Sequence, residues 1–138
     1  MSDTKKTKIS QSNFIQISPS RISYGFQIHS IKEANGMYSW YIPSFDTYFS
    51  SNDKELGEQR AIEISKSFFN YWLKKKGYRA FLMQILKLGY QADSHEELTA
   101  LLRRTNLNGK LRTHNKVLPD AFRKTKGTMQ EGIFATAV

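Results

Sequence analysis

The segment spanning residues 22–42 constrains the fold most, because it has the pattern of two strands joined by a tight turn. Residues 22–31 alternate apolar with polar or small side chains, which is the period of a strand with one buried face. The apolar positions are Ile22, Tyr24, Phe26 and Ile28. Asn35-Gly36 follows, and this dipeptide accepts the positive φ angles of a hairpin turn. Residues 37–42 then return as a second strand, so the pattern predicts an antiparallel sheet.

Two further strands and a long helix are predicted around this hairpin. Residues 14–17 and 45–50 alternate in the same way, although over shorter stretches. Residues 53–76 carry a broad apolar stripe at helical spacing, and Asn52 precedes them as an N-cap. Three lysines and Gly77 end the helix, as is usual near a helix C-terminus.

Shorter helices are expected at residues 78–88 and 94–104, the second beginning with a capping box at Ser94. The predicted fold class is therefore α+β. A three- to four-stranded antiparallel sheet packs on one long helix, and two shorter helices and a basic tail follow.

The chain of 138 residues is long enough for one domain and a tail. Residues 1–11 are mostly polar and are expected to be disordered. Residues 12–104 form the single α+β domain of this prediction. Residues 105–138 hold six basic and two acidic side chains and few apolar ones, so we expect a loosely ordered basic arm.

The formal net charge of +9 favours nucleic acid as a partner, because basic surfaces attract phosphates. Six basic residues lie near predicted helix ends, where they also complement the helix dipole. They are Lys74, Lys75, Lys76, Arg79, Arg103 and Arg104. Six more lie on the tail, where no dipole explains them. They are Lys110, Arg112, Lys116, Arg123, Lys124 and Lys126. We expect all twelve to contact phosphates.

Aromatic side chains on the predicted sheet are candidates for a partner surface. They are Tyr38, Trp40, Tyr41 and Tyr48. The period of a strand places Tyr38 and Trp40 on one face and Tyr41 on the other. Packing against the long helix accounts for one face, so part of the other should stay exposed for a partner or a second subunit.

Little in the sequence points to catalysis. The absence of cysteine excludes disulfides, thiolate zinc sites and cysteine nucleophiles, and the three histidines are widely spaced. We therefore expect no enzyme activity, no metal and no cofactor. One alternative stays open, a small metal-dependent nuclease that uses Asp46 and Glu63.

No segment resembles a signal peptide or a membrane span. The first eight residues are polar, and the longest uninterrupted apolar run is only Ala80-Phe-Leu-Met83. We therefore expect a cytoplasmic protein that does not enter the membrane.

The order of elements over residues 26–75 resembles the HicB-like antitoxin family. A hairpin turns at Asn35-Gly36, the loop Pro43-Ser-Phe-Asp46 leads to another strand, and a polar link at 51–55 leads into a helix. The resemblance implies a non-catalytic module that binds and blocks a small ribonuclease toxin, and that binds operator DNA as an oligomer. The residues and the resemblance together predict a module that contacts a protein partner and nucleic acid. The other alternative is a stand-alone accessory protein that binds RNA or DNA.

Overall fold

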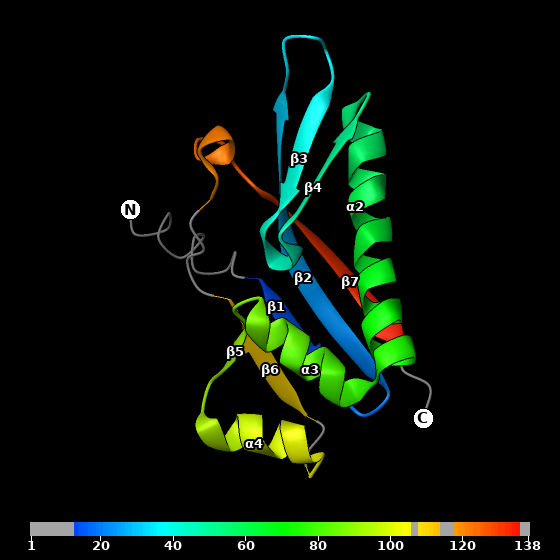
Figure 1. The fold of residues 1–138 in the computed structure, drawn as a ribbon, viewed down its shortest axis with the longest axis vertical. Coiled ribbons are helices and arrows are strands. Elements are labelled where there is room, and N and C mark those ends of the chain that lie inside the picture. The colour runs from blue at the N-terminus through cyan, green and yellow to red at the C-terminus, as the bar shows by residue number, and fades with distance from the viewer. Residues whose placement is uncertain (1–12, 106–107, 114–117, 136–138) are drawn as a thin grey trace.

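In the computed structural model, the described residues are 13–105, 108–113 and 118–135, and they form a seven-stranded antiparallel sheet with three α-helices (Figure 1). The strands are β1 (Phe14–Ile17), β2 (Arg21–Lys32), β3 (Tyr38–Ile42), β4 (Thr47–Ser51), β5 (Gln91–Ala92), β6 (Gly109–Arg112) and β7 (Thr128–Ala135). The α-helices are α2 (Lys54–Phe69), α3 (Tyr78–Lys87) and α4 (His95–Arg103). A π-helical segment, η2 (Asn70–Lys76), continues α2, and two 3₁₀ turns are η1 (Pro43–Phe45) and η3 (Asp120–Phe122).

The twelve-residue strand β2 is the centre of the sheet. Residues 22–25 pair with β1 on one edge and with β7 on the other, and residues 29–32 pair with β3. The predicted hairpin is confirmed, because Gly36 has a φ of 89° and its N–H donates to the Glu33 carbonyl at 3.0 Å. The apolar side of β2 is buried as its alternation predicts.

The predicted fold class is wrong in the size of the sheet and in the tail. Residues expected to form a basic tail supply β6, which pairs with β1, and β7, which pairs with β2 over all eight of its residues. On the side of β7 that faces the helices, Phe134 is the only large apolar residue, beside Thr128, Gln130 and Gly132. The apolar period that marks a strand in a sequence is therefore missing from β7. Its backbone pairs instead with a distant strand.

The helices cover one face of the sheet and close the core. Trp40 of β3 and Phe69 of α2 are buried there, and the Trp40 indole packs directly against Gly57 of α2.

The long helix differs from the prediction in two ways. Asp53, rather than Asn52, is the N-cap, and its carboxylate accepts from the Leu56 N–H at 2.7 Å. The helix also changes from α to π geometry at Asn70.

Candidate nucleic-acid interface

The π-helical segment η2 determines where the three consecutive lysines lie. The Gly77 N–H donates to the Trp72 carbonyl, five residues earlier, at 2.8 Å, which is the hydrogen bond of a π-helix. Side chains five apart therefore share a side, and Lys76 Nζ lies 5.7 Å from the ring centroid of Tyr71. On an α-helix these two side chains would point about 140° apart. π-Helical turns are rare and often mark functional sites.

A shallow hollow runs along the outer side of η2 and the end of α2. It is lined by Ser67, Asn70, Tyr71, Lys74 and Lys75. Lys74, Lys75 and Lys76 are all exposed, and the amide of Asn70 and the hydroxyl of Ser67 add neutral hydrogen-bond donors. The sequence has no Asp or Glu between residues 64 and 92, so no acidic side chain close in sequence offsets these lysines.

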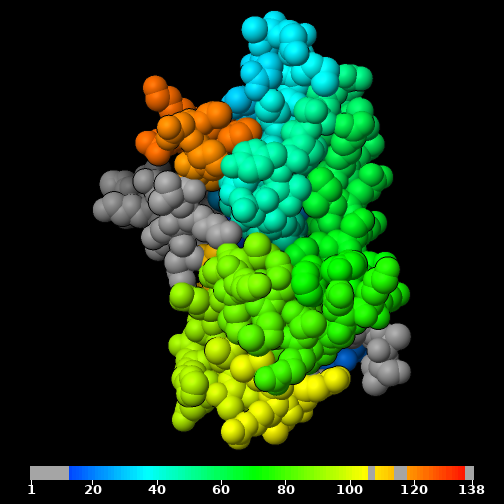
Figure 2. All heavy atoms as spheres, in the orientation of Figure 1, coloured from blue at the N-terminus to red at the C-terminus, as the bar shows by residue number. Residues whose placement is uncertain are grey.

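A cation–π contact joins the end of α4 to this surface. The guanidinium carbon of Arg104 lies 4.8 Å from the ring centroid of Tyr78, the first residue of α3. Arg104 caps α4 with a left-handed φ of 59°, a conformation that non-glycine residues seldom adopt. In Figure 2, the green atoms of η2 and α3 and the yellow atoms that end α4 lie against one another in the lower half of the molecule.

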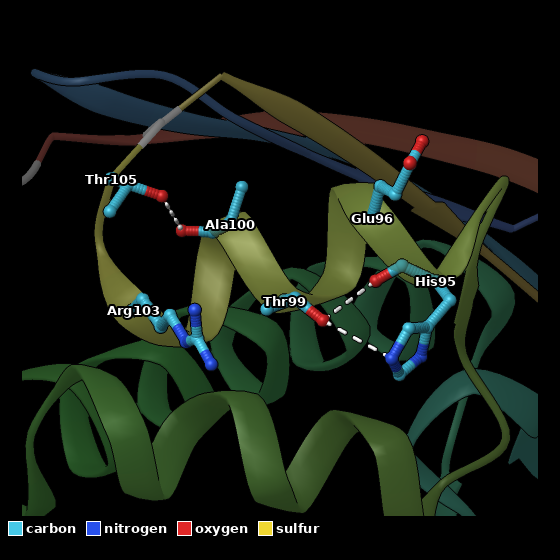
Figure 3. Close-up of a pocket in the computed structure, with 6 residues that line it drawn as sticks. All are labelled: His95, Glu96, Thr99, Ala100, Arg103 and Thr105. Carbon is cyan, nitrogen blue, oxygen red and sulfur yellow. Dashed lines mark hydrogen bonds between the residues drawn. The ribbon is translucent and has the colours of Figure 1, made fainter.

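Arg103 lines a second hollow, on α4 (Figure 3). Its side chain lies on the same side of α4 as His95, whereas Glu96 points to the opposite side. The Thr99 hydroxyl donates to the His95 carbonyl at 2.9 Å, and the Thr105 hydroxyl donates to the Ala100 carbonyl at 3.4 Å. The hydroxyls of this hollow are therefore already bonded to backbone carbonyls of α4, and Arg103 has no ion-pair partner among the residues that the structure describes.

We call the resulting cationic surface the basic end. It consists of Lys74, Lys75, Lys76, Arg79, Arg103 and Arg104. All six are exposed, and none forms an ion pair within the described part of the chain. The sequence predicted these six residues as cations near helix ends. The structure adds Tyr78, Ser67 and Asn70, which no sequence signal marked, because their role depends on the π-helix and on the docking of α4.

The other predicted cations that the structure describes lie on β6 or near η3, outside the basic end. Lys110 and Arg112 lie on β6, where Lys110 Nζ is 4.8 Å from the ring centroid of Phe14 and Arg112 lies 3.9 Å from the Asp93 carboxylate. Arg123 forms an ion pair with Asp120 at 2.8 Å. Lys124 and Lys126 are exposed on the loop between η3 and β7, far from α4 in Figure 1, and Lys116 lies outside the described residues.

The predicted aromatic partner surface is largely enclosed. Trp40 and Tyr41 are 2 % and 6 % exposed, Tyr38 is half-buried, and Tyr48 is 59 % exposed. Phe122 of η3 packs on the face opposite the helices, with its ring centroid 5.8 Å from that of Tyr41. Burial and the neighbouring Asp46 carboxylate, which accepts from the Tyr41 hydroxyl at 3.0 Å, raise the pKa of Tyr41 to about 12.

The acidic residues of the nuclease alternative show no metal-site geometry. Asp46 ends η1 and accepts from Tyr41, and Glu63 is exposed on α2. Across residues 13–105, 108–113 and 118–135, no three His, Asp or Glu side chains come together in a way that could hold a metal ion.

Comparison with known proteins places the chain in no family. It matches no protein-family model, no curated protein and no solved structure. In the described part of the chain, every helix falls short of the length and apolar character that crossing a membrane requires.

Proposed function

We propose that this protein is a non-enzymatic binding module that holds nucleic acid by its phosphates at the basic end. The observation that carries the proposal is the stacking of Arg104 on Tyr78, because it holds the end of α4 and its arginines against the start of α3, which directly follows the lysines of η2. Exposed cations without carboxylate partners attract phosphates and release the counterions condensed on nucleic acid.

The helix dipole does not account for the whole basic end. Lysines in η2 and Arg103 in the last turn of α4 are where the dipole favours positive charge. Arg79, however, lies in the first turn of α3, where the dipole disfavours a cation. Arg104 adopts a left-handed conformation that would suit glycine better. The dipole opposes the charge of Arg79 and the backbone conformation disfavours Arg104, and phosphate binding supplies a reason for both.

Tyr71 gives the surface a group that a base could contact. Its side chain is 43 % exposed and lines the hollow with Lys74 and Lys75. Aromatic rings beside cations stack unpaired bases with little preference for sequence. We therefore propose phosphate contacts supplemented by stacking, without readout of a defined sequence.

The HicB-like resemblance supports a protein partner as a second part of the proposal. The order β2, β3, β4 and α2 is the order of elements on which the resemblance rests. The proposed partner is a small ribonuclease toxin. Co-expression with a small ribonuclease encoded beside this chain, followed by co-purification, tests this part. If no such neighbour binds, the stand-alone accessory protein becomes the better description.

Neutralising part of the basic end tests the nucleic-acid proposal. The test variant replaces Lys75, Lys76 and Arg104 by glutamine. The control variant replaces the exposed Lys32, Lys54 and Lys87, so both variants carry the same net charge. Fluorescence anisotropy with a labelled 20-nucleotide strand and a 20-base-pair duplex should show weaker binding for the test variant only. Equal weakening in both variants would mean that net charge, and not the basic end, determines binding.

A further inference from the structure

The long strand β7 ends the sheet on one side with an unprotected edge. Within the described residues it pairs only with β2, so alternate residues direct their N–H and C=O groups away from the sheet. Proteins usually protect such edges with lysine, proline or a very short strand. The eight residues of β7 contain no lysine, arginine or proline, and their one charged residue is the exposed Glu131, whereas the strands at the two ends of the main order, β4 and β5, have five and two residues.

A groove lies between this edge and the outer side of α2 and η2. It is lined by Lys66, Ser67 and Asn70 from the helical side and by Ile133, Phe134 and Ala135 from β7. Phe134 is held in place, because its ring centroid lies 5.9 Å from that of Phe69 and 5.8 Å from Lys74 Nζ. Ile133 points to the opposite face of β7 and is 61 % exposed.

We propose that this groove binds an extended acidic segment of a partner protein, which adds to the sheet as a strand beside β7. Strand addition between a sheet edge and a helix is a recurring mode of peptide recognition. The outward backbone groups of β7 supply the hydrogen bonds, and residues of α2 and η2 line the other side of the groove. This inference goes beyond nucleic-acid binding and does not depend on it.

The charges beside the groove determine the chemistry of the segment. Lys66 lines the groove, Lys74 lies over Phe134, and Lys75 lines the adjoining hollow that shares Ser67 and Asn70. No carboxylate is among the residues that line either hollow. Side chains of an added strand alternate between the two faces. Those on the side of α2 meet lysines, and those on the other side meet Ile133, so the segment should alternate acidic with apolar residues.

A synthetic peptide tests this alternation directly. The probe is a fluorescently labelled octapeptide of alternating valine and glutamate, and its control alternates valine with lysine. We expect the full chain to bind the glutamate peptide and not the lysine peptide in an anisotropy titration. We also expect the bound peptide to slow hydrogen exchange at alternate amides of β7. Equal binding of both peptides, or unchanged exchange in β7, would overturn the proposal.

Matched variants locate the site and separate it from the basic end. Ile133→Ser and Lys66→Glu should each weaken the glutamate peptide by about tenfold or more, because they remove an apolar contact or reverse a charge. Met83→Ser and Lys87→Glu alter exposed residues of α3, outside the groove, and should bind as the unaltered protein does. Ile133→Ser should keep its affinity for nucleic acid, so the two proposals fail independently. Sedimentation that shows a dimer lost in Ile133→Ser would assign the edge to a second copy of the chain, and would also overturn the proposal.

Discussion

Arg104 and Tyr78 are in contact although they belong to different helices, with 4.8 Å between the guanidinium carbon and the ring centroid. The arginine ends α4 and the tyrosine begins α3, directly after the three lysines of η2. Burial raises the pKa of Tyr78, and the nearby Arg104 charge opposes that rise. This contact holds the end of α4, with its two arginines, against the start of α3, which directly follows the three lysines.

Removing the aromatic ring of Tyr78 should loosen the basic end. Tyr78→Leu keeps an apolar side chain but loses the cation–π contact, which is worth about 0.5–1 kcal/mol at such sites. Affinity for a labelled nucleic-acid strand should fall about threefold. Tyr78→Phe keeps the ring and is the control, with unchanged affinity in the same anisotropy titration. A loss of equal size in Tyr78→Phe would contradict a role for the ring face.

Substitutions at Arg104 should separate stability from binding. Its φ of 59° strains any residue with a β-carbon, whereas glycine adopts this conformation freely. Urea denaturation should therefore find Arg104→Gly more stable than Arg104→Ala by about 1 kcal/mol. Both variants should bind nucleic acid more weakly than the unaltered protein. Equal stability of the glycine and alanine variants would show that the left-handed cap carries no strain.

Gly57→Ala should destabilise the fold although alanine favours helices. A β-carbon at Gly57 would overlap the buried indole of Trp40, which is also fixed by donating to the Ser51 hydroxyl at 2.8 Å. The expected loss is about 1–3 kcal/mol in the free energy of unfolding. Gln59→Ala, on an exposed position of the same helix, is the control and should change stability by less than about 0.5 kcal/mol.

Acidification should weaken the fold through His29. Burial lowers the pKa of His29 from its usual value of 6.5, while its Nδ1 lies 2.9 Å from the Thr125 hydroxyl. The unfolded chain then takes up a proton at a higher pH than the folded chain does. The free energy of unfolding should therefore fall as the pH falls below about 6.5. Denaturation between pH 5.5 and 7.5 should show this slope in the unaltered protein and in His95→Gln, but not in His29→Gln.

The sequence predicts the elements whose signals are local. The alternation in β2, the Asn35-Gly36 turn and the Ser94 cap, whose hydroxyl accepts from the Glu97 N–H at 3.1 Å, all correspond to the structure. Local signals do not predict strand β7, because its partner residues on β2 lie at least 100 residues earlier in the chain. The backbone hydrogen bonds of β7 do not require alternating apolar side chains, so the sequence pattern that marks a strand is missing there.

The candidate site could be predicted only in part. The lysines of η2 and the arginines of α4 stand out by charge, but each group also suits a helix end. How the lysines are placed relative to the arginines depends on the π-helical segment η2 and on the left-handed conformation of Arg104. No sequence pattern predicts either feature. For Tyr41, the sequence predicted the position but not the burial. Its place on the sheet was predicted, yet Phe122 from a distant turn covers it.

The dependence of affinity on salt tests the basic end most directly. Six phosphate contacts predict that log K for a 20-base-pair duplex falls with log salt at a slope of about −5. Replacing Lys75, Lys76 and Arg104 by glutamine should make the slope shallower by about 3. Replacing Lys32, Lys54 and Lys87 should leave it unchanged. Identical slopes for the two variants would contradict the assignment of phosphate binding to this surface.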